Sequence, residues 1–190
     1  MLWMTMSLAA AVTIPRAVVA PTIDDFVTMT PSARVASSVI KVGPFVQREP
    51  NNGQPATEAA DAYLAYDADN FYAVFVCFDH EPAQIRGHMT RRENLTDEDV
   101  VTLYLDTFHD RQRAYAFTVN PAGVQQDAIW SENGGSDTTF DTVWRSQGRR
   151  TETGYVVWIA VPFKSIRFAA TRSEWGLLLG RTIARKREET

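Results

Sequence analysis

Two tryptophans that bracket a polar loop are the residues of this 190-residue chain best suited to chemistry. Trp130 and Trp144 stand on either side of residues 131–141, so they can lie close together where two strands meet. Flat indole faces stack on the C–H faces of a sugar ring, while amide and guanidinium groups bond its hydroxyls. We therefore predict that this pair binds a saccharide. The polar side chains expected to assist it are Asn120, Gln126 and Arg113.

The alternative for each tryptophan is a place in the hydrophobic core, which is the more common position of a single aromatic residue on a strand. A core or edge position is favoured for Trp158, between Val157 and Ile159, and for Trp175, which precedes Gly176. For the first pair, the exposure of the indole rings in the folded chain decides between the two interpretations.

The acidic residues offer many carboxylate pairs, but no catalytic motif accompanies them. The chain has no phosphate-binding loop, no GxSxG or HExxH motif and no paired CxxC. A glycosidase needs two carboxylates across a cleft, one with a raised pKa, whereas acids at strand ends and turns are usually solvated or structural. We therefore do not expect an enzyme, and glycoside hydrolysis remains an alternative. The acids considered are Asp79, Glu81, Asp97, Glu98, Asp99, Asp106, Asp127 and Asp141.

A cation site is conceivable around Asp97, Glu98 and Asp99, together with Asp79 and Asp106 on adjacent predicted strands. Calcium takes about six to eight oxygen ligands from several segments, although the spacing here matches no EF-hand. A solvated acidic loop explains the same residues. Calcium is therefore left open, and no metal ligand is assigned.

The histidines and the single cysteine carry weaker signals. His80, His88 and His109, with Met89, suggest axial haem ligation, but the chain lacks a c-type attachment motif. Cys77 has no second cysteine to pair with and lies in an apolar run, so we expect a buried small hydrophobic residue.

Composition and charge set the class of protein. The chain is 45% hydrophobic and 22% charged, which is ordinary globular composition. A chain of this length buries about 70% of its surface on folding, which is enough for one domain. The net charge of -4 argues against nucleic acid as a partner, because nucleic-acid binding depends on concentrated positive charge.

The first twenty residues differ from the rest of the chain. Residues 1–15 carry no charge, and residues 8–12 form an apolar run. This stretch is too short to span a bilayer as a helix, and a signal peptide cleaved near residues 18–20 fits better. A mis-assigned start codon or an apolar arm is the alternative. We predict a leader over residues 1–20, a domain over residues 21–190, and export.

Short runs of aromatic and β-branched residues, broken by Asp, Asn and Gly, predict a β protein. Residues 71–78 are apolar on both faces, which is typical of a strand in the middle of a sandwich. Residues 100–106 and 114–120 alternate, so each strand should bury one face. Their spacing predicts an antiparallel β-sandwich, with a polar hairpin tip at residues 148–153 and a surface loop at 81–99. The other strands are expected at residues 62–66, 124–130, 142–147, 154–161 and 175–183.

A series of short motifs follows along the chain in a fixed order. They are PTIDDF at residues 21–26, GQPATE at 53–58, YD at 66–67 before FY at 71–72, REN at 92–94 before DED at 97–99, LDTFHD at 105–110, AYAF at 114–117, NPAGVQ at 120–125, DTVW at 141–144, GYVVW at 154–158, VPFKSIRF at 161–168 and WG at 175–176. In these motifs the chain resembles the carbohydrate-binding module family 9-like domain at the N-terminus of large bacterial proteins. In those proteins the domain precedes a predicted outer-membrane β-barrel region.

The resemblance implies a jelly-roll-like antiparallel sandwich of about 8–10 strands. It also implies a non-catalytic carbohydrate-binding function, in a secreted, periplasmic or outer-membrane protein linked to polysaccharide catabolism or uptake. In family 9 modules two tryptophans sandwich a sugar and calcium ions brace the fold; here the pair would be Trp130 and Trp144. Two alternatives remain: a structural periplasmic domain that docks on the C-terminal β-barrel region of its parent protein without binding sugar, and a glycoside hydrolase.

Overall fold

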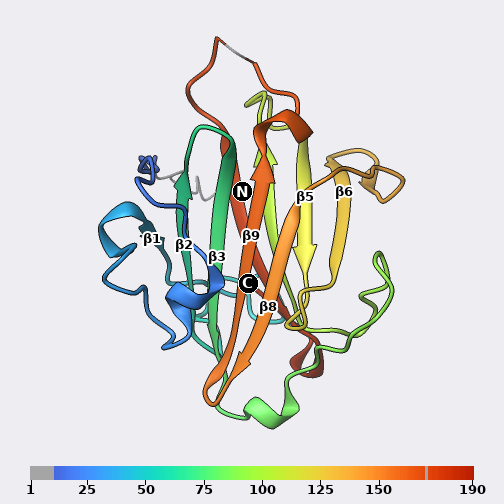
Figure 1. The fold of residues 1–190 in the computed structure, drawn as a ribbon. Coiled ribbons are helices and arrows are strands. Elements are labelled where there is room, and N and C mark those ends of the chain that lie inside the picture. Colours follow the sequence, from blue (N-terminus) through green and yellow to red (C-terminus); the bar gives the residue numbers. More distant parts are fainter. Residues whose placement is uncertain (1–10, 170) are drawn as a thin grey trace.

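The computed structural model describes residues 11–169 and 171–190, which fold into two facing antiparallel sheets (Figure 1). The first sheet contains, in spatial order, β1 (Ile40–Val42), β2 (Ala60–Tyr66), β3 (Asn70–Phe78), β9 (Gly154–Pro162) and β8 (Arg145–Thr151). The second sheet contains β11 (Glu188–Glu189), β10 (Gly176–Ile183), β4 (Val100–Asp106), β5 (Arg113–Val119), β6 (Gln125–Ser131) and β7 (Gly135–Asp137). Short 3₁₀ turns connect them: η1 (Ile23–Phe26), η2 (Ala36–Ser38), η3 (Pro82–Gln84), η4 (Phe163–Ser165) and η5 (Ala184–Lys186). The predicted β-sandwich is confirmed.

The main core fills the space between the two sheets. Phe75 and Leu64 enter it from the first sheet, and Leu103 and Phe117 enter it from the second; all four are fully buried. Cys77 belongs to the same core, as its apolar neighbours predicted. The inward residues of β4 and β5 therefore lie as their alternation predicted, and the other face of these strands is left for a different role.

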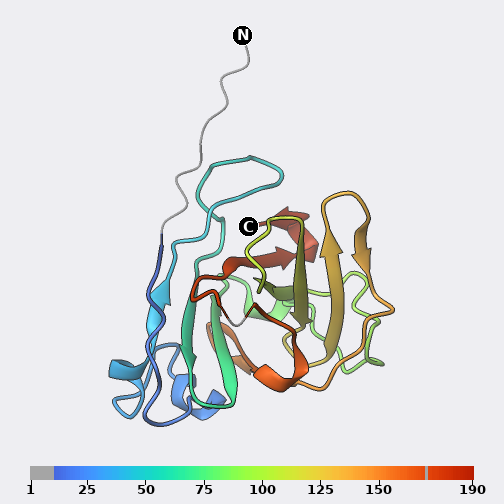
Figure 2. The same ribbon diagram turned by 90° about the horizontal axis from the view of Figure 1, so that it is seen from above.

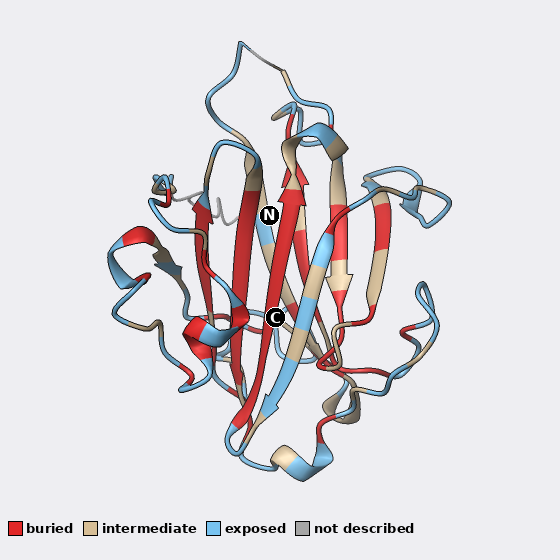
Figure 3. Cartoon of the chain, viewed as in Figure 1, coloured by how far each residue is buried: buried red, intermediate tan, exposed pale blue. Residues whose placement is uncertain are grey.

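β8 departs from the prediction. Residues 148–150 were expected in a polar hairpin tip, yet the strand runs from Arg145 to Thr151 and only Glu152 and Thr153 form the turn. β8 is an edge strand that pairs with β9 alone, so its side chains remain largely exposed while those of β9 are buried (Figure 3). An edge position tolerates charged residues that a central strand would exclude, which is why the strand predicted at residues 142–147 was expected to end too early.

The outer face of the first sheet is covered by the N-terminal segment, which runs along it outside β2 and β3 (Figure 2). Phe26 and Val35 are fully buried there, and the Phe26 ring packs on Tyr63 with 5.2 Å between ring centroids. Asp25 fixes the segment by accepting hydrogen bonds from Arg34 and from the Ser32 hydroxyl at 2.8 Å. This second core explains why β3 is apolar on both faces.

The predicted leader overlaps this covering segment. Residues 1–10 lie outside the described residues. Further on, the Ala17 amide donates to the Tyr66 carbonyl at 2.7 Å, and the Tyr66 amide donates to the Pro15 carbonyl at 3.2 Å. Part of the predicted leader therefore pairs with the end of β2, and cleavage of residues 1–20 stays a prediction.

Candidate functional site

The outer face of the second sheet is the candidate site. Register places Leu178, Tyr104, Ala116 and Ala128 in one row across β10, β4, β5 and β6. Gly180, Thr102, Thr118 and Gln126 form the next row, and Trp130 lies opposite Ala114 at the end of β6. Paired residues point to the same side of a sheet, and this side is opposite the core residues of β4 and β5. We call these residues, Leu178, Tyr104, Ala114, Ala116, Ala128, Gly180, Thr102, Thr118, Gln126 and Trp130, the open face.

The open face combines small residues with larger amphipathic ones. Ala114, Ala116 and Thr118 run along β5, with Tyr104 on one neighbouring strand and Trp130 on the other. Leu178 is 62% exposed and Trp130 is 37% exposed, so apolar surface remains accessible to a ligand. A flat surface with aromatic margins of this kind can accept a ring-shaped ligand.

The polar groups of the open face are uncharged. The Thr102 and Thr118 hydroxyls lie 3.0 Å apart and share a hydrogen bond, and Gln126 follows Thr118 in the same row. Burial raises the pKa of Tyr104, so its hydroxyl stays neutral at physiological pH. Hydroxyl and amide groups both donate and accept hydrogen bonds, which suits a neutral polyhydroxyl ligand.

The predicted platform of two tryptophans is wrong in its geometry. Trp130 lies on the open face, but Trp144 is only 5% exposed and belongs to the core between the sheets. Its ring meets the Phe117 ring edge-on at 5.0 Å between centroids. Residues 131–141 therefore do not bring the two indoles to one surface, because Trp144 enters between the layers while Trp130 points out of the second sheet.

Asn120 and Arg113 are also absent from the open face. Asn120 is fully buried: its side-chain NH₂ donates to the His88 carbonyl at 2.8 Å, and its carbonyl oxygen accepts from the amides of Ala122 and Val124. These bonds hold the turn between β5 and β6, so the amide is unavailable to a ligand. Arg113 lies on the other side of β5 from Ala114, with its guanidinium 5.8 Å from the centroid of the Phe108 ring.

Of the polar residues predicted to bind a saccharide, Gln126 alone shares the open face with Trp130. Tyr104, Thr102 and Thr118 were not predicted as site residues. The alternation of residues 100–106 and 114–120 already placed them on outward faces. The turn at residues 121–123 already predicts β5 and β6 as a hairpin. What the sequence did not reveal is that β4 and β10 lie beside this hairpin, which joins those faces into one surface.

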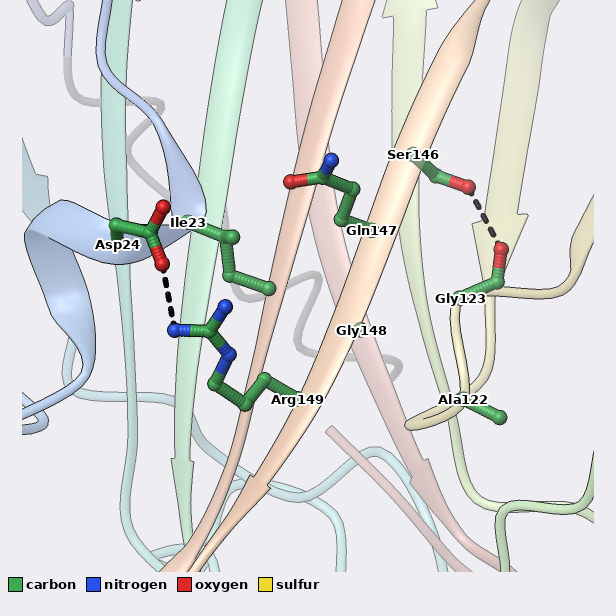
Figure 4. Close-up of a pocket in the computed structure, with 8 residues that line it drawn as sticks. All are labelled: Ile23, Asp24, Ala122, Gly123, Ser146, Gln147, Gly148 and Arg149. Carbon is green, nitrogen blue, oxygen red and sulfur yellow. Dashed lines mark hydrogen bonds and ion pairs between the residues drawn. The ribbon is translucent and has the colours of Figure 1, made fainter.

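A hollow of about 390 Å³ lies beside β8, between η1 and the turn that joins β5 to β6 (Figure 4). Arg149 reaches across it to Asp24, with 2.6 Å between Nη1 and Oδ1. The Ser146 hydroxyl donates to the Gly123 carbonyl at 2.8 Å. The charged and polar groups of this hollow therefore bond one another. We interpret it as a contact between structural elements and not as a ligand site.

Comparisons with known proteins identify the fold. No protein-family model matches the chain, and neither does any curated protein. A family 9 carbohydrate-binding module (CBM9) from Caldicellulosiruptor kristjanssonii, solved in complex with cellotriose, matches with a TM-score of 0.57 and 15% identity. The match covers 92% of this chain and 80% of that one. The chain has the fold of a family 9 carbohydrate-binding module.

The same fold is seen in a CBM9 from that organism in complex with glucose, with a TM-score of 0.54 and 14% identity over 89% of this chain and 77% of that one. The resemblance predicted from the sequence is therefore confirmed for the fold. The β-barrel region expected downstream has no counterpart in these findings and stays a prediction.

Within this family 9 fold, the acids considered for calcium are directed to separate partners. Asp79 binds Arg185, with Oδ1 2.7 Å from Nη2, and Asp106 accepts the Arg111 amide at 2.8 Å. Glu98 accepts the His88 amide at 2.7 Å. In residues 11–169 and 171–190, no three or more His, Cys, Asp or Glu side chains form a group that could hold a metal ion. Each of these acids is therefore engaged by other groups of the protein, and calcium binding stays open, as it does in the sequence.

In the part of the chain that the structure describes, no helix has the length and apolar character needed to cross a membrane.

Proposed function

We propose that this chain is a non-catalytic carbohydrate-binding module whose open face binds a neutral saccharide. The observation that carries the proposal is the outer face of the second sheet, where Trp130 is 37% exposed and the row of Ala116 and Ala128 separates it from the uncharged polar row of Thr118 and Gln126. The family 9 fold supports the same function, since the two matching modules are solved with cellotriose and glucose.

Each residue type on the open face has a role in this proposal. Trp130 stacks on the C–H face of a pyranose, which removes apolar surface of both partners from water. Gln126 and Thr118 lie about 14 Å along the strands from the row of Trp130 and Ala114, so they bond hydroxyls of a further sugar unit of an oligosaccharide. Tyr104 bounds the ligand on the opposite strand. The small side chains of β5 leave room for a sugar ring to approach the sheet closely.

Binding without hydrolysis is favoured over glycoside hydrolysis. Hydrolysis needs two carboxylates across the scissile bond. The outward carboxylate of Asp106, at the end of β4, is occupied by the backbone amides of Phe108, Asp110 and Arg111. A carboxylate engaged in this way is suited to holding a turn and not to transferring a proton to a sugar.

We further propose that the module acts outside the cytoplasm, in the periplasm or at the outer membrane, and serves polysaccharide catabolism or uptake. The uncharged N-terminal stretch supports export. Secretion of an epitope-tagged full chain tests this location: recovery in the periplasmic fraction agrees with it, and retention in the cytosol contradicts it.

Isothermal titration tests the binding proposal. Glucose, cellotriose and xylotriose are titrated into the full chain, into the Trp130→Ala variant and into the Phe168→Ala variant. Phe168 is 43% exposed and lies in the connection between β9 and β10, so it provides an aromatic control that is not one of the open-face residues. We expect Trp130→Ala to weaken binding about tenfold, equivalent to about 1.4 kcal/mol, and Phe168→Ala to leave it unchanged. Absence of binding to every sugar, or equal affinity of both variants, would refute the proposal.

A further inference from the structure

A second hollow lies at the end of the sandwich where β2 turns into β3. Its volume is about 660 Å³, which falls within the range of about 300–1,000 Å³ typical of small-molecule sites. Segments distant in sequence line it, and we call it the strand-end hollow. It is lined by Ala68, Asp69 and Asn70 from the β2–β3 turn, Val143, Trp144 and Arg145 at the start of β8, and Pro162, Phe163 and Lys164 at the end of β9.

The strand-end hollow has an excess of unpaired positive charge. Among the described residues, neither Arg145 nor Lys164 forms an ion pair. Asp69 is the single carboxylate of the lining, so two cations face one anion in a chain whose net charge is -4. The hollow beside β8 differs, because its Arg149 is neutralised by Asp24.

Arg145 is held in place at this site. Its guanidinium carbon lies 5.9 Å from the centroid of the Trp158 ring, and its Nη2 lies 3.4 Å from the side-chain oxygen of Asn70. These contacts use only part of its donor capacity, since a guanidinium carries five N–H groups in a planar fork. The remaining donors match a carboxylate, which accepts two parallel hydrogen bonds from arginine.

Trp144 lines the strand-end hollow, while its ring packs in the core between the sheets. Its indole Nε1 is buried and has no hydrogen-bond partner among the described residues, although the residue lines the hollow. The apolar part of the lining, Val143, Pro162 and Phe163, is suited to the C–H face of a sugar ring.

We propose that the strand-end hollow is a second ligand site, separate from the open face, that binds an acidic sugar. The carboxylate of a uronic acid meets Arg145 and Lys164, and its pyranose ring rests against Phe163. A neutral sugar would leave both cations without a counter-charge, and a small inorganic anion would leave the apolar wall uncovered. The two kinds of lining group together therefore favour a uronate.

Nuclear magnetic resonance of the ¹⁵N-labelled full chain tests this assignment. The indole N–H signal of Trp144 is assigned from its loss in the Trp144→Phe variant. Sodium glucuronate, glucose and sodium sulfate are then added separately to the wild-type protein. We expect glucuronate to shift the Trp144 signal with saturation, and glucose and sulfate to leave it unmoved at the same concentrations. No shift with glucuronate, or an equal shift with sulfate or glucose, overturns the proposal.

Variants localise the site and separate it from the open face. The double variant Arg145→Gln/Lys164→Gln should bind glucuronate at least tenfold more weakly. Arg149→Gln, on the same strand but facing the other hollow, should bind it like the wild type. Trp130→Ala should also retain glucuronate binding, so failure of one site is distinguishable from failure of the other. Unchanged affinity in the double variant contradicts the assignment.

Discussion

Gly148 of β8 packs closely against the turn that joins β5 to β6, so we predict that the Gly148→Ala substitution destabilises the protein. A Cβ added at Gly148 would lie 2.4 Å from the carbonyl oxygen of Pro121 and 2.5 Å from the amide nitrogen of Gly123. Both neighbours are backbone atoms and cannot rotate aside. Ordinary contact begins at 3.4 Å, so the turn and the strand must separate by about 1 Å in the Gly148→Ala variant.

This separation has a calculable cost. Overpacking by one methyl group typically costs about 1–3 kcal/mol. The Ser146 hydroxyl donates to the Gly123 carbonyl at 2.8 Å across the same contact, and weakening that bond adds about 1 kcal/mol. We expect Gly148→Ala to lower the free energy of unfolding by about 2–4 kcal/mol, which lowers the melting temperature by roughly 4–16 °C in a domain of this size.

Gly180→Ala is the matched control. Its added Cβ would meet the Thr190 carbonyl oxygen at 3.6 Å, which is ordinary contact. Replacing glycine by alanine within a strand should stabilise the protein by about 0.5–1 kcal/mol. Urea unfolding followed by tryptophan fluorescence measures both variants. The reasoning is refuted if Gly148→Ala remains within about 0.5 kcal/mol of the wild type, or if Gly180→Ala loses as much stability as Gly148→Ala.

Three further predictions concern the covering segment and the buried charges. Arg34 holds the pKa of Asp25 well below its usual range, and Asp25→Asn removes the counter-charge of Arg34. This substitution should therefore lower the free energy of unfolding by about 2 kcal/mol, as measured by chemical denaturation. Faster proteolysis of the N-terminal segment should accompany the loss. Phe26→Ala removes a fully buried ring and should cost about 3–5 kcal/mol in the same assay. Burial raises the pKa of Glu58, but hydrogen bonds from Lys186 and His80 outweigh it and bring the value to about 2 from 4.5. The stabilisation from Glu58 is therefore complete above pH 4.5 and lost as the pH falls toward 2. Glu58→Gln should flatten the acid limb of a stability-against-pH curve, and an unchanged limb would contradict this.

Several features of the fold could be predicted because they depend on local patterns. Residues 71–78 are apolar on both faces, and β3 is the middle strand of its sheet, packed between two cores. The burial of Cys77 was predictable from the same pattern. The N-terminal segment that covers the first sheet could not be predicted, because its apolar residues are scattered through a stretch without strand periodicity. They form a core only together with the sheet against which they pack.

The site was only partly predictable for a related reason. Trp130 and Trp144 have the same residue type and stand at similar places at the ends of polar stretches. Side chains alternate along a strand, so a shift of one residue moves a ring from the core to the surface. The register of β6 against β5 places Trp130 outside, whereas the entry of the chain into β8 places Trp144 between the sheets.

The sequence by itself determined the class of fold, the positions of most strands and the inward faces of β4 and β5, because periodicity and turn residues act over a few neighbouring positions. The tertiary structure decided which outward faces join into one surface, which tryptophan is exposed and that Arg145 and Lys164 line one hollow. Those properties depend on strand order and register, which arise from contacts between residues far apart in the chain.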